Sequence, residues 1–166
     1  MRASSDKKTT SATAVNSTRR KLTDPGEGLI RRVRRTPKPI YNPIPDQLTG
    51  RLRAPAAAFE PRFPNPEKPD APVDEALSVN VESLLNAAGL PLTWMVDLKK
   101  QYVARITLGD CIANELEAFH VPTKPPQPDN PHHGLIYGLV ELHNIDEDRY
   151  ERTLDALAKT STIVQF

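Results

Sequence analysis

The 166-residue chain lacks the features that mark several protein classes. It has one cysteine, which excludes an intramolecular disulfide framework and a metal site built from cysteines alone. No apolar run approaches the roughly 20 residues that a helix needs to cross a bilayer. No apolar stretch follows the charged N-terminus, so we expect no secretory signal. Together these absences predict a cytoplasmic protein with no membrane partner.

Charge is unevenly distributed, although the whole chain carries a net charge of only +1. Residues 1–40 hold 11 Lys and Arg against 3 Asp and Glu, a net of +8. Residues 41–166 hold the other 11 against 18, a net of −7. The chain is therefore a basic head on an acidic body, and we expect the head to bind acidic molecules.

Composition also divides the chain into segments. Residues 1–27 have few apolar side chains to offset the entropy lost on ordering, so we predict a disordered basic N-terminal tail. Residues 25–72 hold 11 of the 17 prolines, and proline removes a backbone donor and restricts the residue before it. We therefore expect irregular backbone over 37–72, within a single domain that spans 28–166.

The later segments have the periodicity of strands and helices. Residues 28–33, 102–108, 132–140 and 163–166 are predicted strands. Asn80 is expected to cap a helix that ends before Gly89, and Asp146 a helix that continues to Thr160. Residues 109–119 predict a helix, with a strand that begins near Leu116 as the alternative. This order predicts an α+β fold, a small single domain with short mixed strands and two or three helices.

A basic cluster follows the first predicted strand. Its members are Arg31, Arg32, Arg34, Arg35 and Lys38. These side chains could bind phosphates through counterion release, or bind an acidic protein partner. In a strand, Arg32 and Arg34 share one face and Arg31, Val33 and Arg35 the other. The alternative without a ligand is a solvated segment against the acidic body, and no interleaved aromatic residue supports base stacking.

The histidines and the cysteine have poor spacing for metal binding or catalysis. Neighbouring His132 and His133 point to opposite faces of an extended chain, and no helical His pair four residues apart exists. We therefore assign no metal site and no cofactor. Cys111, near a predicted helix start, could form a reactive thiolate. Its neighbour Ile112 instead favours a buried, inert thiol.

Several short elements occur in order along the chain: LIRRV (29–33), AAAFEP (56–61), LSVNVES (77–83), VARITLGDC (103–111) and HHGLIYGL (132–139). In this order they resemble a set of small bacterial proteins of uncharacterised function. The resemblance covers about 29–140 and implies one domain. It also implies that Arg32, Phe59, Ser78 and His133 belong to a shared surface. It implies no reaction, cofactor or catalytic residue.

Three functions follow from these patterns. We expect a non-enzymatic interaction module, an accessory component of a larger bacterial system, whose basic head binds an acidic protein partner. The first alternative is a nucleic-acid-associated protein that binds phosphates through residues 31–38. The second is a small enzyme with a site near Arg32, Ser78 and His133. The candidates for a surface site are Ser78, Trp94, His132 and His133.

Overall fold

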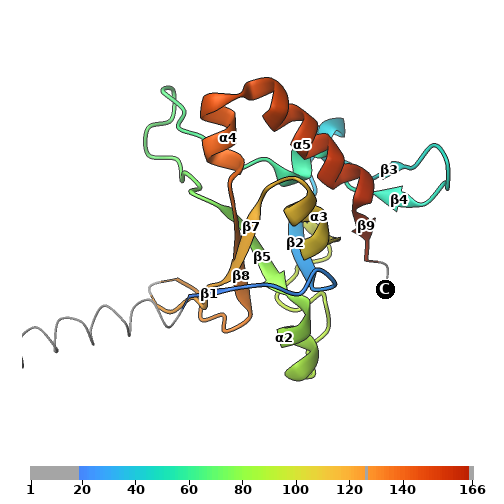
Figure 1. Ribbon diagram of the computed structural model, residues 1–166, viewed down its shortest axis with the longest axis vertical. Coiled ribbons are helices and arrows are strands. Elements are labelled where there is room, and N and C mark those ends of the chain that lie inside the picture. The colour runs from blue at the N-terminus through green and yellow to red at the C-terminus, as the bar shows by residue number, and fades with distance from the viewer. Residues whose placement is uncertain (1–18, 126, 165–166) are drawn as a thin grey trace, which may run out of the picture.

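The computed structural model describes residues 19–125 and 127–164, and most of the predicted tail, residues 1–18, lies outside them. A seven-stranded sheet forms the centre of the domain (Figure 1). Its strand order is β1-β7-β8-β5-β2-β6-β9, and every neighbouring pair is antiparallel. The strands are Arg20–Lys21 (β1), Gly28–Arg34 (β2), Leu77–Val81 (β5), Gln101–Thr107 (β6), Glu117–His120 (β7), His133–Tyr137 (β8) and Thr162–Ile163 (β9).

Four α-helices accompany the sheet in the described residues, so the predicted α+β class is confirmed. They are Glu82–Ala87 (α2), Leu108–Ala113 (α3), Leu139–Ile145 (α4) and Glu147–Thr160 (α5). The proline-rich part contains two 3₁₀ turns, Pro39–Tyr41 (η1) and Ala56–Phe59 (η2), and a small hairpin of Ile44–Pro45 (β3) and Leu52–Arg53 (β4). In the described part of the chain, no helix has the length and apolar character to cross a membrane.

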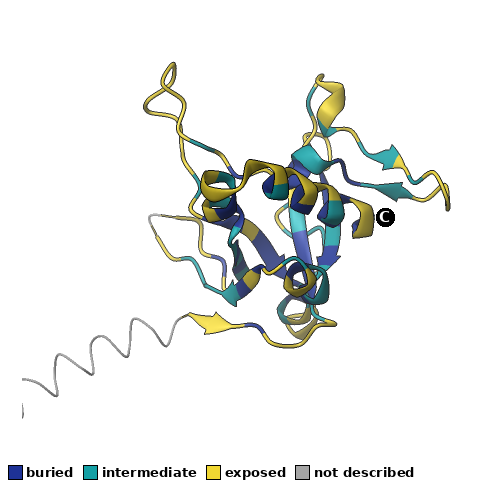
Figure 2. Cartoon of the chain, turned by 45° about the horizontal axis from the view of Figure 1, so that its top comes forward, coloured by how far each residue is buried: buried dark blue, intermediate teal, exposed yellow. Residues whose placement is uncertain are grey.

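The two faces of the sheet pack differently. One face carries the main core, in which Phe59 of η2 and Leu154 and Leu157 of α5 cover apolar strand residues. Figure 2 shows the strands of the sheet largely buried in the centre of the domain. The opposite face has a smaller cluster around Ile30, Leu85 and Val103, covered by side chains from 90–96. Because side chains alternate along a strand, the polar residues of β5 lie on this second face. That face is therefore where polar groups can meet outside the main core.

The predicted helix ends are confirmed at two places. The Asp146 side chain accepts a hydrogen bond from the backbone nitrogen of Arg149 at 3.1 Å and begins α5. Leu154 and Leu157 then fall on the buried face of this helix, as their spacing predicts. Gly89, with a φ of +70°, follows the end of α2 in the left-handed conformation that favours glycine.

Other boundaries differ from the sequence prediction. Asn80 does not cap a helix: it belongs to β5, and α2 begins after Val81 with no side-chain cap. Residues 109–119 follow the alternative, because α3 ends at Ala113 and β7 begins at Glu117. The strand predicted over 132–140 stops at Tyr137, since Gly138, with a φ of +118°, turns the chain into α4.

The domain also begins before residue 28, where the sequence placed its start. β1 pairs with β7, and Leu22 follows it into the main core with 9% of its surface exposed. The Arg19 guanidinium carbon lies 4.4 Å from the ring centroids of both Phe119 and Tyr137. Cation–π contact and one buried leucine hold residues 19–22 against the sheet, although the segment has few apolar residues.

The core packing can be tested at Phe59, which is completely buried. Replacing it with alanine should lower the free energy of unfolding by about 3–5 kcal/mol, because the side chain leaves a cavity under α5. Urea denaturation followed by circular dichroism measures this change. Leu48→Ala is the matched control, because Leu48 is 96% exposed and its loss should have little effect. Equal stability of the two variants would contradict the described core.

Candidate functional site

A cleft opens where β2 and β5 separate. β2 pairs with β6 through seven residue pairs, from Gly28 to Arg34, but with β5 through only two, Leu29–Val81 and Ile30–Asn80. Beyond Ile30 the two strands no longer share backbone hydrogen bonds. The gap forms a cavity of about 180 Å³, lined by Ile30, Arg31, Arg32, Ser78, Val79, Asn80, Gln101 and His133. We call this cavity the strand cleft.

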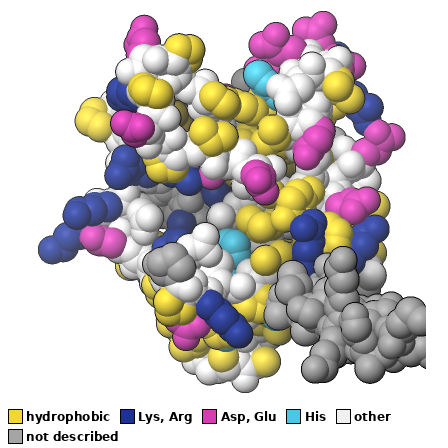
Figure 3. Space-filling view, turned by 90° about the vertical axis from the view of Figure 1, so that its left-hand side faces the viewer, with side chains coloured by type: hydrophobic (Ala, Val, Ile, Leu, Met, Phe, Trp, Pro, Cys, Tyr) yellow, Lys and Arg dark blue, Asp and Glu magenta, His cyan; other side chains and the backbone are white. Residues whose placement is uncertain are grey.

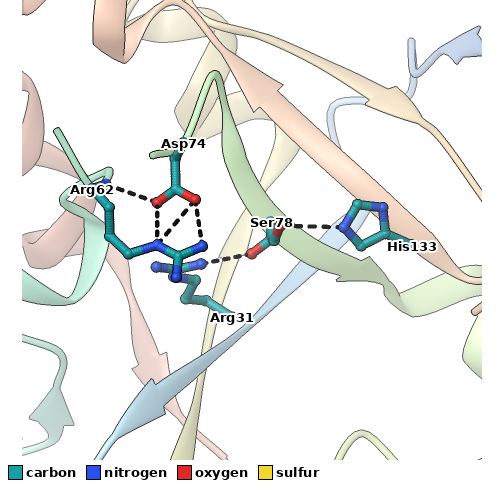
Figure 4. Close-up of polar contacts among 5 residues, drawn as sticks. All are labelled: Arg31, Arg62, Asp74, Ser78 and His133. Carbon is teal, nitrogen blue, oxygen red and sulfur yellow. Dashed lines mark hydrogen bonds and ion pairs between the residues drawn. The ribbon is translucent and has the colours of Figure 1, made fainter. Parts of the chain in front are cut away.

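Arg31 bridges the gap from the side of the main core (Figure 4). Its Nε donates to the carbonyl of Ala58 at 3.1 Å, and its Nη1 donates to the carbonyl of Ser78 at 2.9 Å. Burial lowers the pKa of Arg31 to about 10, and the negative charge of Asp74 opposes this decrease. The guanidinium therefore stays charged at neutral pH and joins η2 to β5.

Asp74 is held in place by a second arginine. The Arg62 side chain donates to its two carboxylate oxygens at 2.8–3.2 Å, and the Arg62 backbone nitrogen donates at 2.7 Å (Figure 4). Burial of Asp74 opposes its ionisation, but these hydrogen bonds and the charges of Arg62 and Arg31 hold its pKa below the usual value. Asp74 is therefore ionised at neutral pH and compensates the half-buried Arg31.

Ser78 and His133 form a hydrogen-bonded pair in the strand cleft (Figure 4). His133 Nδ1 lies 2.8 Å from the carbonyl oxygen of Val121, and Nε2 lies 3.2 Å from Ser78 Oγ. A carbonyl only accepts, so in the neutral ring Nδ1 carries the hydrogen and Nε2 accepts from the serine hydroxyl. Burial lowers the pKa of His133, with the charges of Arg32 and His120 adding to the effect. The imidazole is therefore neutral at pH 7, which is the form of a general base.

Arg32 supplies positive charge to the same cleft. It lies on the opposite face of β2 from Arg31, as the strand alternation predicts, and is exposed. Its Nη1 donates to the carbonyl of Met95 at 3.2 Å. Met95 has a φ of +60°, a conformation uncommon for a residue other than glycine. Arg32, Ser78 and His133, which the sequence proposed as one site, thus surround one cavity.

Four of the five residues of the predicted basic cluster, all but Arg35, line a second cavity. Arg31 donates to backbone carbonyls, and Arg35 Nε donates to the carbonyl of Gln101 at 3.2 Å. A groove of about 530 Å³ lies beside Arg31, Arg32, Arg34 and Lys38 and reaches Glu60 and Arg62. We call it the basic groove. In the view of Figure 3, a His side chain near the centre lies between basic side chains and beside an apolar patch.

The other sequence candidates are dispersed. Trp94 packs against the smaller apolar cluster that contains Ile30, and its ring lies 5.1 Å from that of His132, edge to face, rather than at the Ser78–His133 pair. Phe59, which the family resemblance places on a shared surface, is instead buried in the core.

The remaining histidine and cysteine candidates also lie apart. His120 contacts the carbonyl of Pro131, and His143 stacks on Phe63. Cys111 is buried; burial and the nearby Asp110 raise its pKa to about 12, which opposes formation of a thiolate. No three His, Cys, Asp or Glu residues of 19–125 and 127–164 gather as metal ligands would.

Asn80 and Gln101 also line the strand cleft, and the sequence analysis did not place them there. The signal for Asn80 is the alternation in Leu77–Val81, which puts Ser78 and Asn80 on one face once the segment is read as a strand. Gln101 carries no such signal, because it begins a strand on the far side of β2.

Comparisons with known proteins give this site no precedent. No protein-family model, curated protein or solved structure matches the chain.

The bridging role of Arg31 can be tested by substitution. Arg31→Met should lower the free energy of unfolding by about 3 kcal/mol, because two charge-assisted hydrogen bonds are lost and Asp74 loses a compensating charge. Arg35→Met is the control, since its side chain is exposed and makes one such contact. Chemical denaturation of both variants measures the difference. An Arg31 variant as stable as the Arg35 variant would rule out a structural role for the bridge.

Proposed function

We propose that the protein is a small enzyme that binds an anionic substrate in the strand cleft. The observation that carries the proposal is the Ser78–His133 hydrogen bond, in the same cavity as the exposed Arg32 guanidinium. A hydroxyl, an imidazole base and a group that orients the base are the parts required for nucleophilic catalysis. Here the carbonyl of Val121 is the orienting group. Ser78 and His133 therefore have defined roles.

The reaction class is the transfer of an acyl or phosphoryl group to water. Ser78 Oγ forms a bond to the electrophilic centre while its proton passes to Nε2 of His133. The imidazolium then gives this proton to the leaving group as the bond to that group breaks. In the second half, His133 removes a proton from water, whose oxygen attacks the same centre, and the bond between Ser78 Oγ and that centre breaks as His133 returns the proton to Oγ. The Arg32 guanidinium offers fork-shaped donors for an oxyanion of the substrate.

An electrophilic serine probe tests the nucleophile without knowledge of the substrate. An alkyl fluorophosphonate should label the full chain at Ser78, since Nε2 of His133 accepts the proton of Oγ. Mass spectrometry of the digested protein locates the label. Ser78→Ala should abolish labelling, while Ser83→Ala, at an exposed position on α2, should leave it unchanged. An intact, unlabelled wild-type protein would refute the proposed chemistry.

The pH dependence of labelling tests the base. Only neutral His133 can accept the proton, and burial lowers its pKa below 6.5. The labelling rate should therefore be constant near neutral pH and fall as the pH decreases through a midpoint below 6.5. His133→Gln should remove this dependence and slow labelling by about 100-fold or more. A midpoint well above 7 would argue against His133 as the base.

A second candidate function is the binding of an acidic protein partner in the cytoplasm. The basic groove favours it, because Arg34 and Lys38 line this cavity of about 530 Å³ and form no salt bridge within the described chain. Nucleic-acid phosphates carry the same charge and are the alternative ligand for residues 31–38. This role does not require Ser78 or His133, so it can be separated from the enzymatic one.

Charge reversal in the groove distinguishes these ligands. Arg34→Glu with Lys38→Glu should abolish capture of an acidic protein partner from a nuclease-treated lysate, with Ser78 labelling unchanged. Affinity for an RNA or DNA oligonucleotide that decreases steeply with salt, and is lost in the same variant, would instead favour nucleic acid. Point substitutions are required, because removal of residues 1–38 would also remove β2 from the sheet. The substitutions Lys99→Glu and Lys100→Glu, outside the groove, provide the control.

A further inference from the structure

Asn80 lies in the strand cleft between two of the residues that define it. On β5 it pairs with Ile30 of β2 on one side and with His133 of β8 on the other. Ser78 lies two residues away on the same face. Asn80 is only 5% exposed, yet it lines the cavity. A polar side chain at this depth is costly unless its hydrogen-bonding groups find partners.

The orientation of the Asn80 amide is determined by a chain of hydrogen bonds. The backbone N–H of His132 can only donate, so the Asn130 atom 2.9 Å from it is the acceptor, Oδ1. The other end of the Asn130 amide is therefore Nδ2, which donates to Asn80 Oδ1 at 2.8 Å. Both asparagines are buried. The backbone of Asn130 is held by reciprocal hydrogen bonds with Thr123 at 3.0 and 3.1 Å.

This relay leaves one group without a partner. Oδ1 of Asn80 accepts the hydrogen bond from Asn130, so Nδ2 of Asn80 is the end of the amide that faces the cleft. Among residues 19–125 and 127–164, Nδ2 donates to no acceptor, and it is not one of the buried atoms without a partner there, which are His143 Nδ1 and Tyr150 Oη; it is therefore an accessible donor. An amide N–H group only donates, so Nδ2 can bind only a hydrogen-bond acceptor of a ligand, such as a deprotonated oxygen.

We infer that Asn80 Nδ2 is a substrate-binding donor that, together with Arg32, holds an oxyanion in the strand cleft. Asn130 is the positioning residue, because it keeps the Asn80 amide in the orientation in which Nδ2 faces the cleft. Asn130 itself does not line the cleft. The inference deepens the proposed function, on whose cleft it rests, and names the group recognised: a phosphoryl or similar oxyanion group of the substrate. Preorganised donors of this kind stabilise charge that develops on an oxygen.

Inorganic phosphate is the probe, and the side-chain amide resonances of the ¹⁵N-labelled full chain are the readout. Phosphate should shift the Asn80 Nδ2 resonances and the Arg32 Nε resonance with one shared affinity, and leave the Asn86 side-chain amide on α2 unmoved. Asn80→Ala should weaken phosphate binding by about tenfold. The wild-type titration by itself is decisive if this variant does not fold, because stationary Asn80 resonances would overturn the inference.

Two substitutions of the positioning residue separate orientation from packing. In Asn130→Asp the second carboxylate oxygen faces Asn80, so the amide should rotate to donate to it and present Oδ1 to the cleft. Phosphate binding should then weaken by about tenfold or more, and phosphate should no longer shift the Asn80 resonances. Asn130→Ala allows the amide to rotate freely, so the loss should be only about threefold. Equal affinities for wild type and both variants would overturn the relay.

The outcomes also distinguish this inference from the proposed function. Labelled Ser78 with stationary Asn80 resonances refutes the donor role alone. Phosphate binding at Asn80 with unlabelled Ser78 supports the donor role and refutes the nucleophile alone. If the Asn80 donor and the Ser78 nucleophile act on the same bound group, Asn130→Asp should also lower the rate of Ser78 labelling by about 100-fold. The reason is that the phosphonyl oxygen of the probe then loses its donor, Asn80 Nδ2.

Discussion

The domain depends on the guanidinium of Arg31, placed where two strands of its sheet part. β2 is firmly paired with β6, but only two residue pairs join it to β5, so the two halves of the sheet have little backbone contact. Arg31 donates to carbonyls of η2 and β5, and the carboxylate of Asp74 compensates its positive charge. Asp74 is itself held in place by a salt bridge with Arg62. An apolar side chain could fill the space, but it would provide no donor for these carbonyls.

The same separation of strands creates the candidate site. Because β2 and β5 diverge, Ser78 and Arg32 face a cavity instead of pairing directly, while β8 stays beside β5 and places His133 next to Ser78. The imidazole is oriented by the carbonyl of Val121 at one ring nitrogen and is free to act as a base at the other. A structural charge behind the sheet and an exposed charge in front of it thus come from consecutive arginines, Arg31 and Arg32.

Local patterns predicted much of the fold. The periodicity of 147–160, the cap at Asp146, the turn at Gly89 and the strand near 102–108 depend on neighbours a few residues away, and all are confirmed. Predictions failed where distant contacts overrode local preference. Asn80 resembles a helix cap, but pairing with β8 and the hydrogen bond from Asn130 keep it in a strand. Residues 19–22 look too polar to order, yet the edge of β7 and two aromatic rings hold them.

By itself, the sequence determined the α+β class, the alternation that sends Arg31 and Arg32 to opposite faces, and the division into a basic head and an acidic body. The resemblance to small bacterial proteins singled out Arg32, Ser78 and His133, together with Phe59, without showing which of them meet. Only the tertiary structure decided that Ser78 contacts His133 across 55 positions and that Asn130 orients Asn80 across 50. Such contacts follow from strand order and register, which the packing of many distant apolar residues sets together.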